Sequence, residues 1–216
     1  MRARALLVTT SLLVTGLGTV AAEAAKTPPT CNMAVDTTGD TNNDLEGAPV
    51  FPADSGLDLV GGDVATNAKN ITAVIRLADE PGDATVYVKR YIAQFKVAGQ
   101  ANPMILAAAV TATGTTYSFG WYGDSATGTG YNYAATEATG SIEGKIITIT
   151  AALADVAATP ELGPVKKGSK INALTLTANR RLPAVTQAPG IVYPADEALG
   201  KGIYYAGNAS CVKVPA

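Results

Sequence analysis

The sequence predicts an all-β fold: an antiparallel β-sandwich of the jelly-roll or immunoglobulin-like kind, closed by one disulfide between its two ends. Three observations lead to this prediction. The chain is rich in Thr, Val, Ile, Tyr and Gly, its apolar residues recur with a period of two, and turn-forming residues separate the short apolar runs. No long segment has the period of a helix, which favours two packed sheets.

Several segments have the alternating pattern of strands. In residues 85–97 every second side chain from Tyr91 to Val97 is apolar, whereas Gln94 and Lys96 between them are polar. Such alternation is typical of a strand with one face in the core and one face in solvent. The predicted strands cover residues 71–77, 85–97, 103–110, 114–122, 144–150, 170–177 and 203–205.

The remaining patterns complete the predicted domain. Residues 103–110 form a continuous apolar run, which suits a strand covered on both faces, and the alanine-rich residues 151–155 could form a helical turn. Residues 123–141, rich in Gly, Thr, Ala and Tyr, and residues 179–202, with several prolines, are predicted as excursions at one end of the sandwich. No repeat or linker divides the chain, so residues 25–216 are predicted to form one domain.

Residues 1–24 predict an export signal. Two arginines supply the positive start, residues 5–20 are mostly apolar, and Ala-Glu-Ala at the end is a small-x-small cleavage pattern. The apolar run is short and interrupted by Thr, Ser and Gly, so it is not predicted to span a membrane. We therefore expect cleavage near Ala24, a secreted, extracellular mature chain, and no membrane insertion.

Cys31 and Cys211 are the only cysteines, and they lie just inside the two ends of the mature chain. In an exported protein such a pair is expected to form a disulfide. A redox role is not expected, because catalytic cysteine pairs lie close together in sequence. In the loop-entropy model, closing so long a loop contributes roughly 5 kcal/mol of stability.

The order of turns and strands resembles a known group of modules. The turn at 36–40 (Asp-Thr-Thr-Gly-Asp), residues 56–60 (Gly-Leu-Asp-Leu-Val) and a strand such as 70–77 resemble the opening of CBM9-like and DOMON-like β-sandwich modules of secreted bacterial proteins. Residues 145–150, the turn at 162–168 and a last long strand continue the similarity. The resemblance implies a β-sandwich that binds sugars, haem or other small ligands, or an accessory module. Because the chain has no histidine, it departs from the haem-binding branch, and haem is not expected.

The composition excludes several classes of function. The absence of histidine excludes Ser-His-Asp and Cys-His catalysis and histidine-ligated metals. The formal net charge is −2, so electrostatics gives no reason to expect nucleic acid as a partner. No carboxylate pair or serine stands in a recognisable catalytic motif, and the chain is not expected to be an enzyme.

The acidic run at residues 36–44, Asp-Thr-Thr-Gly-Asp-Thr-Asn-Asn-Asp, is the sharpest local motif. Acidic and amide side chains at this spacing can direct several oxygens to one point, as Ca²⁺ requires, although the run does not follow the EF-hand pattern. The predicted ligands of a structural calcium ion are Asp36, Asp40, Asn42 and Asp44. Asp58 or Asp63 from neighbouring loops could complete the shell. The alternative is a solvated turn whose Asx side chains bond their own backbone.

A cluster of aromatic residues lies within one predicted strand and the segment after it. Flat rings beside hydroxyl groups are suited to sugars. Alternation places Tyr117, Phe119 and Trp121 on one face, which favours packing in the core, and loop anchoring is the alternative for the other rings. The predicted ligand-binding residues are Trp121, Tyr122, Asp124, Tyr131 and Tyr133.

Together these patterns predict a secreted, non-enzymatic ligand-binding or accessory module with carbohydrate as the leading ligand. The expected partner is a polysaccharide or another component of the cell envelope. The alternative is a structural or protein-interaction protein of the cell envelope without a small-molecule site, which would work through its edge strands and loops.

Overall fold

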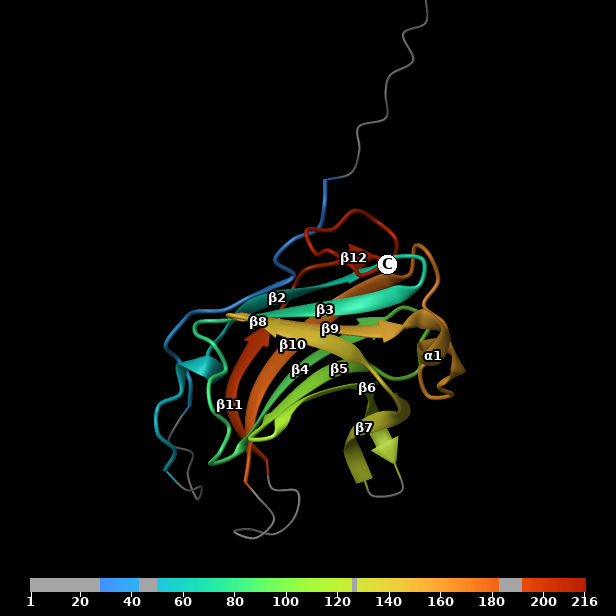
Figure 1. The fold of residues 1–216 in the computed structure, drawn as a ribbon. Helices are drawn as coiled ribbons and strands as arrows, with labels where there is room; N and C mark the ends of the chain where they lie inside the picture. Colours follow the sequence, from blue (N-terminus) through green and yellow to red (C-terminus); the bar gives the residue numbers. More distant parts are fainter. Residues whose placement is uncertain (1–27, 43–49, 126–127, 183–191) are drawn as a thin grey trace, which may run out of the picture.

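Two antiparallel β-sheets face each other and enclose a shared core (Figure 1). The computed structural model describes residues 28–42, 50–125, 128–182 and 192–216. Nearly all of its regular structure is β, and Cys31 and Cys211 form a disulfide. The predicted antiparallel β-sandwich with one disulfide between its ends is therefore confirmed. The predicted export signal, residues 1–24, lies outside the described residues.

One sheet has five strands in the order β1-β2-β3-β9-β8, and each strand is antiparallel to its neighbours. Its strands are β1 (Ala34–Val35), β2 (Leu59–Thr66), β3 (Asn70–Leu77), β8 (Thr139–Glu143) and β9 (Ile146–Ala152). The short 3-10 helix η1 (Ser55–Leu57) precedes β2. The helix α1 (Leu153–Ala158) follows β9 directly, close to the helical turn that the alanine-rich sequence predicts.

The second sheet has seven strands in the order β11-β10-β4-β5-β6-β7, with β12 paired to the start of β10. Its strands are β4 (Val88–Val97), β5 (Met104–Thr111), β6 (Gly114–Ser125), β7 (Gly128–Glu137), β10 (Lys170–Arg181), β11 (Val192–Leu199) and β12 (Tyr204–Tyr205). β7 and β11 therefore lie at opposite edges of this sheet.

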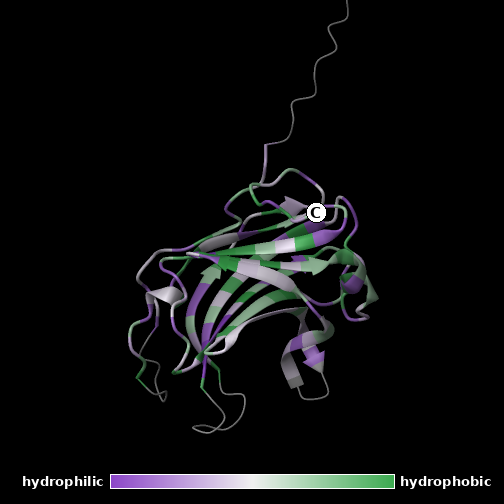
Figure 2. Ribbon diagram, in the orientation of Figure 1, coloured by the Kyte–Doolittle hydropathy of each residue, from purple (hydrophilic) through white to green (hydrophobic). Residues whose placement is uncertain are grey.

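Alternation along the strands builds the core, and Figure 2 shows it as stripes of apolar and polar residues. In β4, Tyr91 and Phe95 are fully buried, whereas Lys96 is exposed. In β5, the consecutive residues Ile105 and Leu106 are both fully buried. Because consecutive side chains of a strand point to opposite faces, β5 is covered on both faces, as its continuous apolar run predicts.

Two segments that the sequence predicts as excursions contain strands instead. β7 lies within residues 123–141 and β11 lies within residues 179–202, so these two predictions were wrong. Small residues in β7 and a proline in β11 weaken the alternating pattern. Both are edge strands, which are fixed by pairing with a single neighbour and need less apolar sequence than a central strand.

The N-terminal segment, residues 28–42, connects the two sheets along one side of the sandwich. Its start is tied to the C-terminal part of the chain by the disulfide and by the N–H of Cys211, which donates to the carbonyl of Thr30 (3.2 Å). β1 in its middle pairs with β2 of the five-stranded sheet. At its far end, the N–H of Asn42 donates to the carbonyl of Ala195 in β11 (2.7 Å). The segment therefore links β2 of one sheet to β11 of the other.

A buried arginine supports the far end of this segment. Arg180 in β10 is fully buried, and its Nη1 donates to the carbonyl of Asn42 (2.8 Å). Its guanidinium also lies over the rings of Phe51 and Tyr87, with its carbon 5.0 and 5.8 Å from their centroids. Because a buried charge is costly unless it has partners, these contacts favour one position of the segment against β10.

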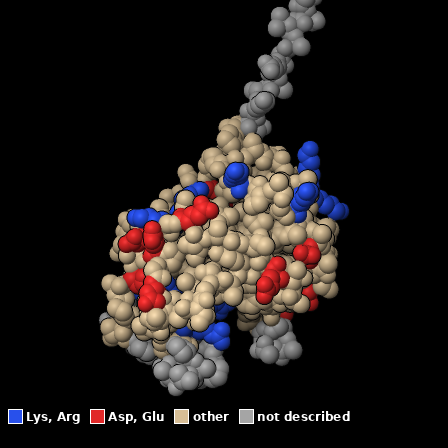
Figure 3. Space-filling model, viewed as in Figure 1, with Lys and Arg blue, Asp and Glu red and all other residues tan. Residues whose placement is uncertain are grey.

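Acidic and basic side chains are interspersed on the face of the molecule that Figure 3 shows. This distribution agrees with the small net charge of −2. The visible face therefore has no basic stripe that would attract a polyanion. Within the described ranges, none of the helices has the length and apolar character that crossing a membrane requires.

Candidate functional site

Three carboxylates from two distant parts of the chain converge beside the N-terminal segment. Asp36 and Asp40 belong to that segment, and Asp196 belongs to β11. One oxygen atom of each carboxylate lies within 4.8 Å of the corresponding oxygens of the other two. Oxygen atoms at this spacing can share one cation, and carboxylates are preferred ligands of Ca²⁺.

Backbone hydrogen bonds hold these carboxylates in place. The N–H of Asp36 donates to the carbonyl of Val60 in β2 (2.9 Å). In β11 the register with β10 shifts at Ala195, and such a bulge redirects the neighbouring side chains. The carboxylate of Asp196 then reaches the five-stranded sheet, where its Oδ2 accepts from the N–H of Leu59 (2.6 Å). The same carboxylate therefore faces both sheets and the N-terminal segment.

A fourth carboxylate, Asp58, is only 4% exposed, and its charge contributes to the raised pKa of Asp36. Its Oδ2 accepts from the N–H of Gly39 in the N-terminal segment (2.7 Å). Among the described residues, neither its Oδ1 nor the buried Oδ2 of Asp36 has a hydrogen-bond partner. Buried polar atoms nearly always have one, and a cation between Asp36, Asp40 and Asp196 would supply a partner for the carboxylate of Asp36. We call Asp36, Asp40, Asp58 and Asp196 the acidic group.

Two of these carboxylates, Asp36 and Asp196, have raised pKa values. Burial raises the pKa of Asp196 to about 6; the N–H groups of Leu59 and Glu197 act against this rise, and the charges of Asp36 and Asp40 add to it. Burial also raises the pKa of Asp36; the N–H of Thr37 acts against this rise, and the charges of Asp40 and Asp58 add to it. Asp36 and Asp196 therefore resist ionisation unless a cation neutralises their surroundings.

In metal-free protein, we expect the free energy of unfolding to fall as the pH rises from about 4 to about 6. The folded-state pKa values of Asp36 and Asp196 lie above the ordinary value of 3.8, so the folded chain binds more protons than the unfolded chain in this window. Stability therefore decreases as these protons are lost. Urea unfolding at a series of pH values measures the slope. Asp196→Asn should flatten it, and an equal slope in both proteins would contradict this origin.

The structure brings two of the four predicted calcium ligands together. Asp36 and Asp40 lie in the acidic group. Asn42 is exposed, and its backbone N–H and carbonyl both bond elements of the seven-stranded sheet. Asp44 lies outside the described residues. The regular spacing of the acidic run thus identifies part of the group but not its whole set of side chains.

The other acidic residues behave differently from one another. Asp58, which the sequence offers as an additional ligand, adjoins the group, whereas Asp63 forms an ion pair with Arg76. Asp196 was missed by the sequence analysis, because it lies in a segment predicted as an excursion. Its position depends on the pairing of β11 with β10, and no local sequence motif predicts such a long-range contact.

The predicted aromatic residues lie on the hairpin of β6 and β7 at one edge of the seven-stranded sheet. Tyr122 and Tyr131 are paired across the two strands, and their ring centroids are 5.3 Å apart. Tyr131 packs against a small buried cluster outside the main core, formed by Ile92, Ile105 and Ala107. Tyr122 is 37% exposed, so its ring remains accessible beside this packed support.

Tyr133 follows on the same side of β7, and Arg90 of β4 contacts it. The guanidinium of Arg90 donates to the Tyr133 hydroxyl, and its carbon lies 5.5 Å from the ring centroid. Burial raises the pKa of Tyr133, while the charge and hydrogen bond of Arg90 lower it. The residue is nevertheless 37% exposed. We call Tyr122, Tyr131 and Tyr133 the tyrosine face.

The other two predicted ligand-binding residues lie apart from the tyrosine face. Trp121 is half-buried and packs against the main core, as the alternation along the strand predicts. Asp124 is exposed, and its carboxylate accepts from the hydroxyl of Thr129 across the hairpin. The five predicted residues therefore share one hairpin but do not share one surface.

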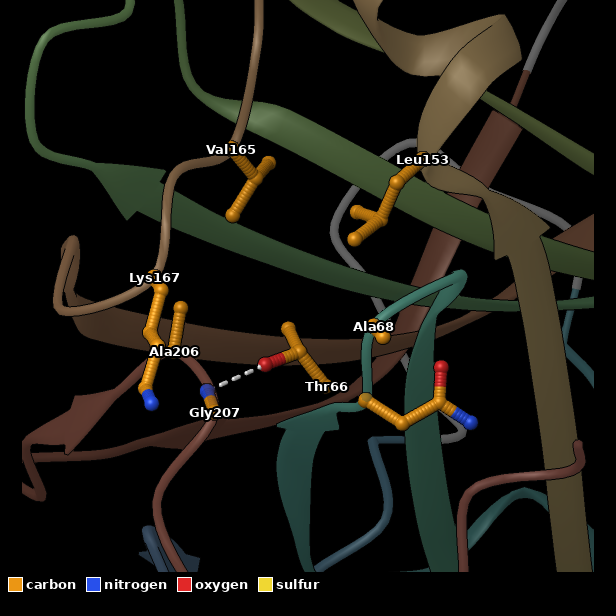
Figure 4. A pocket seen from close by; sticks show the side chains of 8 residues that line it. Thr66, Ala68, Leu153, Val165, Lys167, Ala206 and Gly207 are labelled. Carbon is orange, nitrogen blue, oxygen red and sulfur yellow. Dashed lines mark hydrogen bonds between the residues drawn. The ribbon is translucent and has the colours of Figure 1, made fainter.

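A cavity of about 460 Å³ lies between the turn after β2, the start of α1 and the C-terminal part of the chain (Figure 4). Leu153 and Val165 provide apolar walls, and Lys167 stands at one side. The hydroxyl of Thr66 accepts from the N–H of Gly207 (2.7 Å). Among the described residues that line this cavity, none has a buried polar atom without a partner, so nothing here points to a ligand.

No protein-family model, curated protein or solved structure matches the chain. The functional evidence therefore comes from the acidic group and the β6–β7 hairpin.

Proposed function

We propose that this protein is an exported, non-enzymatic β-sandwich module that binds carbohydrate on its tyrosine face and Ca²⁺ in its acidic group. The tyrosine face is the observation that carries the ligand-binding part. It combines exposed aromatic rings, phenol hydroxyls and a guanidinium on one packed support. The C–H face of a sugar packs on such rings, and its hydroxyls bond the polar groups at their edges.

The acidic group supports Ca²⁺ as the cofactor. All the side-chain atoms that the group offers to a metal ion are carboxylate oxygens, which hard cations such as Ca²⁺ prefer as ligands. Two of these oxygens are buried without a hydrogen-bond partner in the described part of the chain, and extracellular calcium concentrations suit sites of modest affinity. Asp36, Asp40 and Asp196 would hold the ion, with Asp58 beside them. Bound Ca²⁺ would neutralise the group and link the N-terminal segment to both sheets.

The two proposed sites are structurally separate. The acidic group includes Asp196 on β11, at one edge of the seven-stranded sheet, and the tyrosine face lies on the hairpin that forms the other edge. Calcium would therefore act on the stability of the sandwich and would not contact the sugar. Removal of calcium from a protein that remains folded should leave carbohydrate binding unchanged.

Tyr122→Ala and Tyr131→Ala should each weaken carbohydrate binding about three- to tenfold, the effect of losing an aromatic contact of ~0.5–1.5 kcal/mol. The measurement is depletion of the mature, oxidised protein from solution by a panel of insoluble polysaccharides and cell-wall preparations. Tyr205→Ala is the matched control, because Tyr205 is 46% exposed and lies outside the hairpin. Thermal melts verify that each variant is folded. Wild-type protein that is depleted by none of these materials would contradict carbohydrate binding.

A structural or protein-interaction role is the second candidate, and the exposed apolar side chains favour it. Val35 is 65% exposed and Leu199 is 68% exposed, on the short strand β1 and the edge strand β11. Exposed edges of sheets can pair with another chain. If no polysaccharide depletes the protein, substitutions on these strands should decide whether they contact a protein partner.

A further inference from the structure

We propose a second ligand site on the same hairpin: a cavity at Trp121, Asp155 and Glu161 that binds a hexosamine through its ammonium group. The proposal rests on the proposed function for the sugar class. It goes beyond that function in assigning a cavity that shares only Tyr133 with the tyrosine face, and in naming the ionic group of the ligand.

The cavity has a volume of about 290 Å³ and lies between the hairpin and the α1 region. The hairpin contributes Trp121, Tyr133 and Thr136, whereas α1 and the following turn contribute Asp155, Thr159 and Glu161. This volume is near the lower end of the range for ligand pockets, about 300 Å³, and suits a ligand of the size of one sugar ring.

The α1 side of the cavity is fixed by hydrogen bonds to its backbone. The hydroxyl of Thr159 donates to the carbonyl of Asp155 (3.0 Å). The side-chain amide of Asn102, which follows β4, donates to the carbonyl of Glu161 (3.1 Å). These bonds hold the backbone that carries both carboxylates without using the carboxylates themselves. A site whose frame is ordered before binding loses less entropy when the ligand arrives.

Trp121 provides an aromatic wall and a donor without an acceptor. Its indole is half-buried, and its Nε1 is buried without a hydrogen-bond partner among the described residues. A buried tryptophan N–H normally has such a partner. A hydroxyl oxygen of a ligand in the cavity would supply the missing acceptor after a small adjustment of the ring. The ring itself offers a flat surface to the C–H groups of a sugar.

Asp155 and Glu161 determine the charge of the ligand. Both are half-buried, and within the described ranges neither carboxylate has a hydrogen-bond donor or an ion-pair partner. Arg90 contacts Tyr133 but does not line the cavity. Among the described residues that line it, none is a lysine or an arginine. An ammonium group donates strong, charge-assisted hydrogen bonds to carboxylates. A hexosamine carries this group together with the hydroxyl oxygens that the indole N–H requires.

The single tryptophan of the chain makes the site directly observable, because selectively excited tryptophan fluorescence reports on this cavity alone. We would titrate the mature, oxidised protein with D-glucosamine, D-glucose and ethanolamine at a pH where the amines are protonated. We expect a saturable change with glucosamine. Glucose, which lacks the ammonium, and ethanolamine, which lacks the sugar ring, should each bind at least about tenfold more weakly.

Matched variants test the carboxylates. Asp155→Asn and Glu161→Gln keep the shape of the side chains and should each weaken glucosamine binding about tenfold. Glu137→Gln is the control, because Glu137 is an exposed carboxylate of β7 that does not line the cavity. The proposal is overturned if glucosamine gives no saturable change, if glucose or ethanolamine binds as well as glucosamine, or if the two cavity variants behave like Glu137→Gln.

The outcome is distinguishable from a failure of the proposed function. Tyr122→Ala should abolish or weaken polysaccharide depletion and leave the glucosamine titration unchanged, since Tyr122 does not line the cavity. Conversely, Glu161→Gln should leave polysaccharide depletion unchanged. If the wild-type protein is depleted by a polysaccharide but does not bind glucosamine, the cavity alone is overturned. If it binds glucosamine but no polysaccharide depletes it, the tyrosine face alone is overturned.

Discussion

Replacing Cys31 and Cys211 together by serine is expected to lower the free energy of unfolding by about 5 kcal/mol. The two cysteines are separated by 180 residues in sequence, so the disulfide restricts nearly the whole unfolded chain. For a chain of this size, such a loss corresponds to a decrease of roughly 10–20 °C in melting temperature. Replacing both cysteines leaves no free thiol that could form other disulfides.

Urea unfolding of the wild-type protein and the double serine variant measures this effect. The variant retains the backbone bonds between the ends, such as the N–H of Thr30 to the carbonyl of Ala209 (3.2 Å), so it should still fold. Wild-type protein with its disulfide chemically reduced should match the variant. A loss below about 1 kcal/mol would mean that the ends are held chiefly by these backbone contacts, contrary to the loop-entropy expectation.

Saturating Ca²⁺ at neutral pH is expected to raise the melting temperature by roughly 5–10 °C. A ligand present at 100 times its dissociation constant stabilises the folded state by about 2.7 kcal/mol. For a chain of this size, that stabilisation corresponds to the stated rise in melting temperature. Asp40→Asn should remove most of the increase, because it takes one charge from the three carboxylates that would share the ion. Thermal melts in calcium and in chelator measure the difference.

Glu197→Gln is the matched control for this calcium effect. Glu197 is the exposed neighbour of Asp196, so its substitution changes the local charge without removing a member of the acidic group. It should retain the stabilisation by Ca²⁺. Equal melting temperatures of the wild-type protein in calcium and in chelator would refute the calcium site, and so would an undiminished increase in Asp40→Asn.

Alternation and turn chemistry were enough to predict the fold class and most of the inner strands. Tyr91 and Phe95 of β4 are buried as predicted, and the apolar run of β5 is covered on both faces. The edge strands β7 and β11 could not be found in this way. Their residues are held by hydrogen bonds to one neighbouring strand, which small or polar side chains satisfy as well as apolar ones.

The candidate sites were predictable only where a single segment builds them. Asp36 and Asp40 follow from the spacing of one acidic run, and the split between Trp121 and Tyr122 follows from alternation along one strand. Asp196 joins the acidic group through the bulge of β11, and Asp155 meets the hairpin only through the packing of α1. Contacts of this kind depend on tertiary structure, which leaves no signature in the spacing of nearby residues.

Isothermal titration calorimetry of Ca²⁺ into the metal-free, oxidised protein tests the central claim, that the acidic group closes the sandwich around one calcium ion. We predict saturable binding of one ion per chain in the wild-type protein and in Glu197→Gln, and loss of that binding in Asp40→Asn and Asp196→Asn. No binding to the wild-type protein, or unchanged binding to the Asp40→Asn and Asp196→Asn variants, would contradict the claim.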